Sequence, residues 1–274
     1  MADLSITAAW EETAGFVKRE GRLLFPLGFM LMALPVALLR LLIPVTEPGR
    51  VPEPGLWLLL LPIALVGLLL GNLAVIDLAL SPGRSVRDSL RDGLRRLPQA
   101  LAAALLIGFV YLVALVLLSI VVALLVPGGM EAAARPGGAA DPAAMRATLL
   151  LYLLLLPVAL FIGVRMLVLL PVAAAEKAGP IRMIRRSWSL TGRHFWKLLA
   201  FVVLLEILLW VVALAIISVG GILIILLAGE IRPGSFGSFL MILLLAALIT
   251  AIAPVVATLI ARIYAQLAAP ARGG

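Results

Sequence analysis

Two long apolar runs separated by a short basic insert constrain the fold of this chain more than any other feature. Apolar residues fill 147–175, resume at about 198 and continue to 228. Each run exceeds the roughly 20 residues that a helix needs to cross a bilayer. The insert, 176–197, carries too many charged residues to cross with them. The pattern predicts two membrane spans joined by a helix at the membrane surface.

Similar apolar runs elsewhere in the chain predict six spans in all. Hydrophobic residues make up 64% of the chain and charged residues 13%, whereas soluble domains contain about 45–50% and about 25%. Lipid offers the backbone no hydrogen-bond partner, and the runs lack the alternation of a barrel strand, so the spans are expected to be helices. The predicted spans are 23–45, 57–80, 99–126, 147–175, 198–228 and 239–266. We therefore expect a single integral membrane domain over 1–274, an all-α polytopic helix bundle.

Several prolines and glycines lie inside the predicted spans. The prolines are expected to kink the helices locally; they are Pro26, Pro35, Pro62, Pro157, Pro171 and Pro254. Gly67 and Gly71 form a pair of small residues four apart, which is expected to pack closely on another span of the same chain rather than on a second copy. Gly220 and Gly221 leave two alternatives open, a break in the fifth span or a close helix crossing.

The basic residues predict which side of the membrane each connection occupies. Segments 1–22, 81–98, 176–197 and 262–274 contain sixteen of the 22 Lys and Arg residues, and the alternate loops contain four. Because cytoplasmic loops carry an excess of Lys and Arg, both termini are expected to lie in the cytoplasm.

The first three of these basic segments align with one another without gaps. The matched sets are Ile6, Trp10, Thr13 and Val17, then Val86, Leu90, Gly93 and Leu97, then Ile184, Trp188, Thr191 and Phe195. The spacing places each set on one face of a helix, and a small residue, Ala9, Ser89 or Ser187, precedes the second member each time. We expect three repeat units of an amphipathic helix plus two spans, over about 3–80, 84–175 and 180–266. Chance recurrence of apolar spacing is the alternative.

Helix-start signals support helices in two of these segments. Ser85 followed by Asp88 is typical of a capping box, and Gly179-Pro180 places proline at a first helical position. Such helices are expected to lie in the headgroup layer, where each arginine contributes about 1 kcal/mol to the attraction of anionic lipid. The candidate lipid-headgroup contacts are Arg87, Arg91, Arg95, Arg182, Arg185, Arg186 and Trp188. The alternative is ordinary cytoplasmic positive charge without lipid preference.

Charged residues inside the spans are costly and are therefore functional candidates. Arg165 in the fourth span and Glu206 in the fifth lie at a similar predicted depth of about 13 Å, and we expect them to pair. Asn72 or Asp77 in the second span would complete a polar cluster. Two interpretations remain open: a substrate or proton site open to the cytoplasm, or a buried pair that fixes helix register.

The segment around the basic insert also resembles a known family. The residues that carry the resemblance are Arg165, Pro171, Glu176, Gly179-Pro180, Arg186-Ser187-Trp188-Ser189-Leu190-Thr191 and Phe195-Trp196. They resemble the membrane domain in front of some bacterial glycerophosphodiester phosphodiesterases, and related stand-alone six-span inner-membrane proteins. The resemblance implies a six-span fold in the bacterial inner membrane. Because this chain ends at Gly274, we expect the catalytic barrel to be missing, and the resemblance does not imply phosphodiester hydrolysis.

Residue usage argues against several classes of site. Cysteine is absent and His194 is the one histidine, so neither a metal site nor a disulfide is expected. No phosphate loop, nucleophile–base set or nucleic-acid patch is present, and no cofactor is expected.

The expected function is therefore not enzymatic. We expect an accessory or structural membrane protein that contacts anionic lipid headgroups or an unidentified protein partner. The alternative is a small transporter or lipid-handling permease with a polar site near Arg165 and Glu206, which a water-accessible cavity reaching both residues would favour. A membrane enzyme ranks third, because the chain lacks an evident acid–base set.

Overall fold

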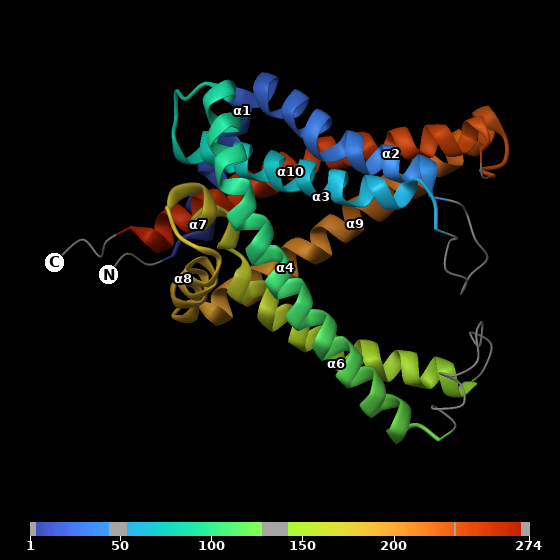
Figure 1. The fold of residues 1–274 in the computed structure, drawn as a ribbon. Coiled ribbons are helices and arrows are strands. Elements are labelled where there is room, and N and C mark those ends of the chain that lie inside the picture. Colours follow the sequence, from blue (N-terminus) through green and yellow to red (C-terminus); the bar gives the residue numbers. More distant parts are fainter. Residues whose placement is uncertain (1–3, 44–53, 128–141, 233, 270–274) are drawn as a thin grey trace.

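The computed structural model describes residues 4–43, 54–127, 142–232 and 234–269, and all regular structure in these residues is helical (Figure 1). The predicted outer loops, 46–56 and 127–145, lie largely outside the described residues. The helices are α1 (Ile6–Gly28), η1 (Phe29–Ala33), α2 (Leu34–Leu42), α3 (Trp57–Leu80), α4 (Val86–Leu125), α6 (Pro142–Met166), α7 (Leu169–Ala175), α8 (Pro180–Gly192), α9 (Phe195–Ala228) and α10 (Phe236–Ala268).

Six helical segments are long and apolar enough to cross a membrane. They are Ile6–Leu42, Trp57–Leu80, Val86–Leu125, Met145–Ala175, Phe195–Ala228 and Phe236–Ala268. Many of their large apolar side chains face outward; Trp210, Leu226 and Leu227 are 72%, 75% and 83% exposed. An apolar surface of this extent is suited to lipid rather than to water. The predicted all-α, six-span bundle is confirmed.

The predicted amphipathic helices form a separate element in only one of the three segments. α8 begins at Pro180, as the Gly-Pro signal predicts, and Arg193 and His194 separate it from α9. The first amphipathic segment instead continues into its span through α1, and the second does so within the 40-residue α4. The expectation of separate surface helices is therefore wrong for the first two units. A single proline inside α4, Pro98, does not end that helix, since proline in a helix more often produces a kink than a stop.

Two of the prolines coincide with departures from regular α-helix. Pro26 lies in α1 shortly before η1, which is a π-helical turn. The fourth span is divided between α6 and α7 at Leu167 and Val168. Because Pro171 has no N–H, it cannot donate to the carbonyl four residues earlier. The break also leaves carbonyls in the last turn of α6 available to other donors.

Glycines mark the closest helix crossings. A Cβ on Gly67 would lie 2.8 Å from the carbonyl oxygen of Leu31, and one on Gly71 would lie 2.7 Å from Cγ of Met32. The Gly67–Gly71 pair therefore packs on η1 of the same chain, as predicted. Gly220 does not break α9 but approaches α10, because a Cβ there would lie 2.4 Å from Cδ2 of Leu244. Of the two alternatives for the Gly220-Gly221 pair, the close crossing is the one observed.

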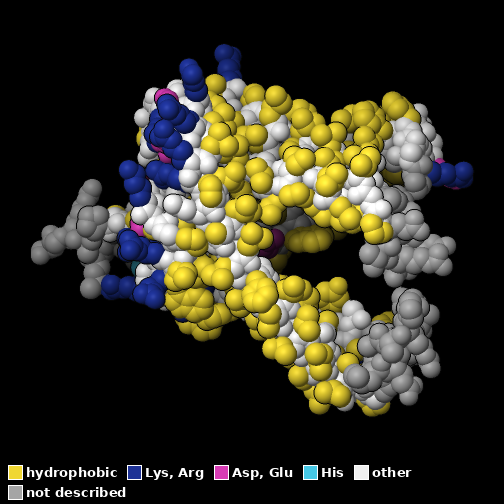
Figure 2. Space-filling model, viewed as in Figure 1, with side chains coloured by type: hydrophobic (Ala, Val, Ile, Leu, Met, Phe, Trp, Pro, Cys, Tyr) yellow, Lys and Arg dark blue, Asp and Glu magenta, His cyan; other side chains and the backbone are white. Residues whose placement is uncertain are grey.

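The helices converge at one end of the molecule and diverge at the other (Figure 1). α7, α8 and the beginnings of α1 and α4 gather at the convergent end, whereas α2, α3 and α10 form one arm and α6 with the second half of α4 forms another. The main buried cluster lies near the convergence and includes Phe16, Leu73, Val172, Met183 and Tyr264. Figure 2 shows Lys and Arg side chains gathered at the convergent end and a hollow between the two arms. We call the convergent end the charged end.

Each predicted amphipathic segment packs against a span outside its own predicted repeat unit. The start of α4 packs on α3, α8 packs on α6 and α7, and α1 packs on α10, the last span. The N–H of Ser5 donates to Oε1 of Gln266 at 2.9 Å, which joins the beginning of α1 to the end of α10. The two ends of the described chain therefore lie on the same side of the bundle.

Candidate functional site

The side chain of Arg165 lies among aromatic rings at the C-terminal end of α6. Its guanidinium carbon is 5.4 Å from the ring centroid of Phe161, 5.0 Å from that of Trp188 and 5.1 Å from that of Phe195. Cation–π attraction operates over such distances, and it is stronger where the cation is desolvated. Nη1 of Arg165 also donates to the carbonyl oxygen of Trp188 at 3.4 Å. Arg165 thus joins α6 to α8 and to the start of α9.

The backbone of Arg165 is held by the same helix, α8. The hydroxyl of Ser187 donates to the carbonyl oxygen of Arg165 at 2.8 Å, and that of Thr191 approaches the same oxygen at 3.4 Å. Ser187 and Thr191 are fully buried. This carbonyl lies in the last turn of α6, immediately before the helix break, where intrahelical donors run out. The Ser-Trp-Ser-Leu-Thr element at 187–191 therefore holds both the side chain and the carbonyl of Arg165.

The predicted Arg165–Glu206 pair is not present. Both residues are described, and no ion pair joins them; Glu206 is exposed on α9. Arg165 is instead drawn to the rings and carbonyl supplied by α8, which the helix break brings close. Spacing along the sequence gave equal depth for the two side chains but not the direction in which each points.

The remaining members of the predicted polar cluster also have other partners. Nδ2 of Asn72 donates to the carbonyl oxygen of Leu68 in its own helix at 2.8 Å. Both carboxylate oxygens of Asp77 accept hydrogen bonds from Nη1 of Arg84 at 3.0 Å. The structure therefore does not assemble Arg165, Glu206, Asn72 and Asp77 into one site.

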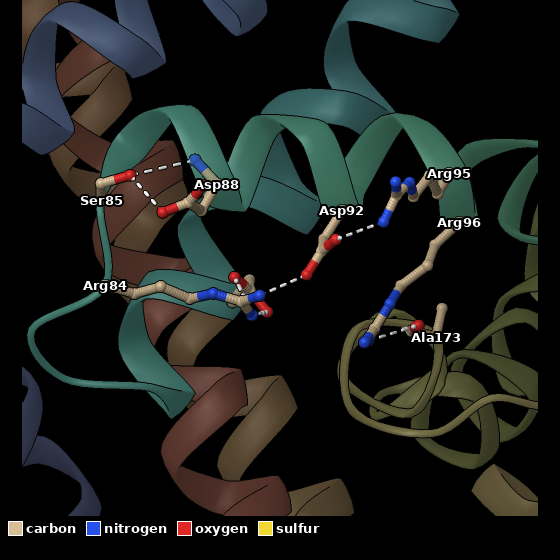
Figure 3. A network of polar contacts seen from close by, with 8 residues as sticks. Arg84, Ser85, Asp88, Asp92, Arg95, Arg96 and Ala173 are labelled. Carbon is tan, nitrogen blue, oxygen red and sulfur yellow. Dashed lines mark hydrogen bonds and ion pairs between the residues drawn. The ribbon is translucent and has the colours of Figure 1, made fainter.

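Arg84 instead organises a polar network at the charged end (Figure 3). It lies between α3 and α4, contacts the buried Asp77 through Nη1, and donates to Asp92 of α4 through Nη2. Asp92 also lies 3.7 Å from Arg95. Asp77 is the main cause that raises the pKa of Arg84 above its usual value, with smaller contributions from Asp92 and Asp88, while desolvation by burial acts in the opposite direction. The network fixes the turn between the second span and α4.

The predicted helix cap adjoins this network. Oγ of Ser85 accepts from the N–H of Asp88 at 3.1 Å and donates to its carboxylate at 2.7 Å. The same end of α4 is joined to α7, because Nη1 of Arg96 donates to the carbonyl oxygen of Ala173 at 3.3 Å (Figure 3). The Ser85–Asp88 start signal is therefore confirmed.

A second network joins the basic insert to the last span. Oε1 of Glu176 accepts from Nε of Arg186 at 3.0 Å and from the hydroxyl of Tyr264 at 3.1 Å. Arg262, two residues before Tyr264 in α10, lies 3.7 Å from Glu12 and 5.5 Å from the ring centroid of Phe16. These contacts bind the start of α1 and the insert to the end of α10.

The candidate headgroup residues have distinct environments. Those that are exposed at the charged end are Arg87, Arg91, Arg95, Arg182, Arg185, Arg186 and Trp188. Arg186 is partly engaged by Glu176, and Trp188 packs against Arg165 and Phe161 while remaining 42% exposed. Arg182 and Arg185 are exposed on α8, while Arg87 and Arg91 are exposed on α4. These four arginines therefore extend into the solvent or headgroup region.

The sequence did not single out the ion pairs of Arg84 or the Glu176–Tyr264 contact. Arg84 lies before the first residue of α4 and turns back towards Asp77. The only sequence signal is opposite charge seven residues apart across a turn, which is weak. Among the described residues, no group of three or more His, Cys, Asp or Glu side chains is placed to hold a metal ion.

Comparison with known proteins supports the membrane-domain assignment. Residues 143–270 match the family model described as the membrane domain of glycerophosphoryl diester phosphodiesterase. The matched region contains the fourth to sixth spans, α8 and the Arg165 contacts. Searches of curated proteins and of solved structures found no match. The chain is thus a multi-pass integral membrane protein with six spans, similar over these residues to that membrane domain.

Proposed function

We propose that this six-span protein, similar over residues 143–270 to a phosphodiesterase membrane domain, is a non-enzymatic accessory or structural protein of the bacterial inner membrane. In this proposal its charged end contacts anionic lipid headgroups. The observation that carries the proposal is the set of exposed arginines on α4 and α8, gathered at one end of an otherwise apolar surface (Figure 2). Arginine is well suited to phosphate because its planar guanidinium can donate two parallel hydrogen bonds.

The proposed orientation places this charged end, with both termini, in the cytoplasm. The Ser5–Gln266 hydrogen bond and the Glu12–Arg262 contact place the beginning and end of the described chain together. Most of the basic residues in the sequence lie in segments at this end, and Lys and Arg are enriched on the cytoplasmic side. The cytoplasmic leaflet is also the one whose anionic lipids attract basic segments.

The contacts of the intramembrane polar residues support an accessory or structural role over transport. Arg165 holds α8 against α6, Asn72 bonds to its own helix, and Asp77 fixes the turn at Arg84. A transporter would require several intramembrane polar groups to face one water-accessible cavity, whereas Arg165, Asn72 and Asp77 each have a separate structural contact. Arg165 and Glu206, which the transporter alternative requires in one site, are not paired.

Lipid binding by the arginines is testable on the intact protein. The full chain, purified in a neutral detergent, is titrated with dioleoyl phosphatidylglycerol or dioleoyl phosphatidylcholine, and bound lipid is counted by native mass spectrometry. We expect preferential binding of phosphatidylglycerol that weakens with added salt. Replacing Arg182 and Arg185 together with Gln should reduce its affinity about thirtyfold, from roughly 1 kcal/mol for each of the two charges near a lipid surface.

A matched control separates a local site from net charge. The comparison is with Arg182→Gln alone, so that each variant removes one charge. Arg232→Gln removes it from an exposed ion pair at the opposite end of the bundle and should leave phosphatidylglycerol binding unchanged. Equal binding of the two lipids by the wild-type chain would contradict the proposal. Retention of a tightly bound acidic protein through purification, together with equal lipid binding, would instead indicate a protein partner for this surface.

The orientation has its own test. Because the chain contains no cysteine, single cysteines introduced at Ser189, exposed at the charged end, and at Glu230, exposed at the other end, can be labelled without background. In intact cells a membrane-impermeant maleimide should label the cysteine at position 230 and spare the one at 189. The reverse pattern would contradict a cytoplasmic charged end.

A further inference from the structure

A small pocket at the charged end combines an unpaired carboxylate with an apolar floor. It has a volume of about 220 Å³ and lies between α1, the end of α3 and the turn that follows it. The lining residues are Phe16, Glu20, Leu23, Leu24, Leu78, Gly83 and Arg84. We propose that this pocket binds the headgroup of an ethanolamine phospholipid, with the ammonium group donating hydrogen bonds to Glu20.

The charges around the pocket favour a cation over an anion. Arg84, the basic residue of the lining, already donates to both Asp77 and Asp92. Glu20 has no hydrogen bond or ion pair with any residue that the structure describes. The two carboxylates already engage the guanidinium of Arg84. Glu20 is therefore the charged group of the lining that is left for a ligand, and it calls for a cation.

The position of the pocket suits a lipid. Glu20 lies one turn before Leu23 and Leu24, where the apolar part of the first span begins. Leu23 is 48% exposed and Leu78 is buried, so an apolar surface continues from the pocket towards the membrane interior. A headgroup bound at Glu20 would leave its acyl chains to extend over Leu23. A primary ammonium group has three N–H donors for a carboxylate, which a trimethylated choline headgroup lacks.

This site is separate from the arginine surface of the proposed function. It takes a zwitterionic lipid rather than an anionic one, and it involves α1 and the end of α3 rather than α8. Lipid binding at one place can therefore fail while binding at the other is observed.

The test uses the full chain in neutral detergent and native mass spectrometry with dioleoyl lipids. We expect phosphatidylethanolamine to bind more tightly than phosphatidylcholine. Glu20→Gln should weaken phosphatidylethanolamine binding about threefold to tenfold, the range for one partly exposed charged contact. The matched control is Glu11→Gln, which removes the same charge from an exposed position of the same helix outside the pocket, and it should leave the affinity unchanged.

A second variant keeps the test decisive if Glu20→Gln folds poorly. Leu23→Trp fills the pocket from a half-exposed position and should also weaken phosphatidylethanolamine binding, while phosphatidylglycerol binding is retained. Millimolar free ethanolamine should not displace the lipid. The proposal is overturned if neither variant changes phosphatidylethanolamine binding, if phosphatidylcholine binds equally well, or if free ethanolamine displaces the lipid and so identifies a soluble amine as the ligand.

Discussion

Replacing Ser187 with alanine is expected to destabilise the bundle by removing the donor to the carbonyl of Arg165. That hydrogen bond is 2.8 Å long and joins the fully buried Ser187 to the partly buried Arg165. A typical hydrogen bond contributes about 1 kcal/mol, and leaving a buried carbonyl unsatisfied costs about 1–3 kcal/mol. The hydroxyl of Thr191 lies 3.4 Å from the same oxygen and can replace part of the loss. We therefore expect the unfolding free energy to fall by about 1–2 kcal/mol.

The double variant sharpens this prediction. The shorter bond of Thr191 is to the carbonyl of Ser187 in its own helix, at 2.9 Å. Thr191→Val alone should therefore cost about 0.5 kcal/mol or less, since that carbonyl lies within a helix. Combined with Ser187→Ala it leaves the carbonyl of Arg165 without either hydroxyl, and the cost should exceed the sum of the single variants.

The assay is equilibrium unfolding in mixed micelles with an increasing fraction of sodium dodecyl sulfate, followed by circular dichroism. Ser189→Ala is the matched control, because Ser189 is exposed in the same helix and bonds only to the carbonyl of Arg186.

Ser89 occupies the equivalent position of the second unit, is fully buried, and its hydroxyl has no hydrogen-bond partner. Ser89→Ala should therefore leave stability unchanged or raise it by up to about 1 kcal/mol. The reasoning would be refuted if Ser187→Ala cost no more than Ser189→Ala, or if Ser89→Ala cost as much as Ser187→Ala.

Three further predictions use the same unfolding assay. Asp77→Asn should lower the unfolding free energy by about 1–3 kcal/mol, because it breaks an ion pair in which both oxygens of a buried carboxylate accept from Nη1 of Arg84. The exposed Asp88→Asn should lower it by about 0.5 kcal/mol, and equal losses would contradict the role given to the network. Gly67→Ala should lower the unfolding free energy by about 1–3 kcal/mol, because the added methyl group meets a backbone oxygen of η1. Its control is Gly108→Ala, where no atom of another element lies within 4 Å of the added methyl group, and this change should be neutral or slightly stabilising. Glu206→Gln should lower the unfolding free energy by no more than about 0.5 kcal/mol and can raise it, since the carboxylate is exposed and unpaired in an apolar span. A larger loss of stability would reveal a partner for this residue.

The six spans were predictable because they depend on sums over many residues. A run such as 198–228 contains no charged residue apart from Glu206, so its total transfer free energy identifies a span whatever the rotation of the helix. The observed α9, Phe195–Ala228, begins only three residues earlier. Helix starts at Ser85 and at Gly179-Pro180 were predictable for a different reason, since the cap residues act on their own local backbone.

The polar contacts were not predictable because they depend on the direction of single side chains. Arg165 and Glu206 lie at similar depth, but contact also requires the rotation of two helices about their axes. The break at Leu167 and Val168 changes the rotation of α6 relative to α7, and so the direction in which Arg165 points. Asp77 was a candidate member of the polar cluster at Arg165, yet its partner, Arg84, lies in the turn seven residues later. Spacing predicts depth and face within one helix, and it does not specify the neighbour that a face meets.

The repeat hypothesis gains a physical argument from what the small residues do. Ala9, Ser89 and Ser187 are all fully buried, and each lies where an amphipathic segment packs on a span of a neighbouring unit. A small residue there allows the two backbones to approach, whatever its polarity. Only in the third unit does the neighbouring span break and offer a free carbonyl, and only there does the hydroxyl have an acceptor. On this argument Ser187 holds a broken helix, and the different outcomes expected for Ser187→Ala, a loss of stability, and for Ser89→Ala, no loss, test the distinction directly.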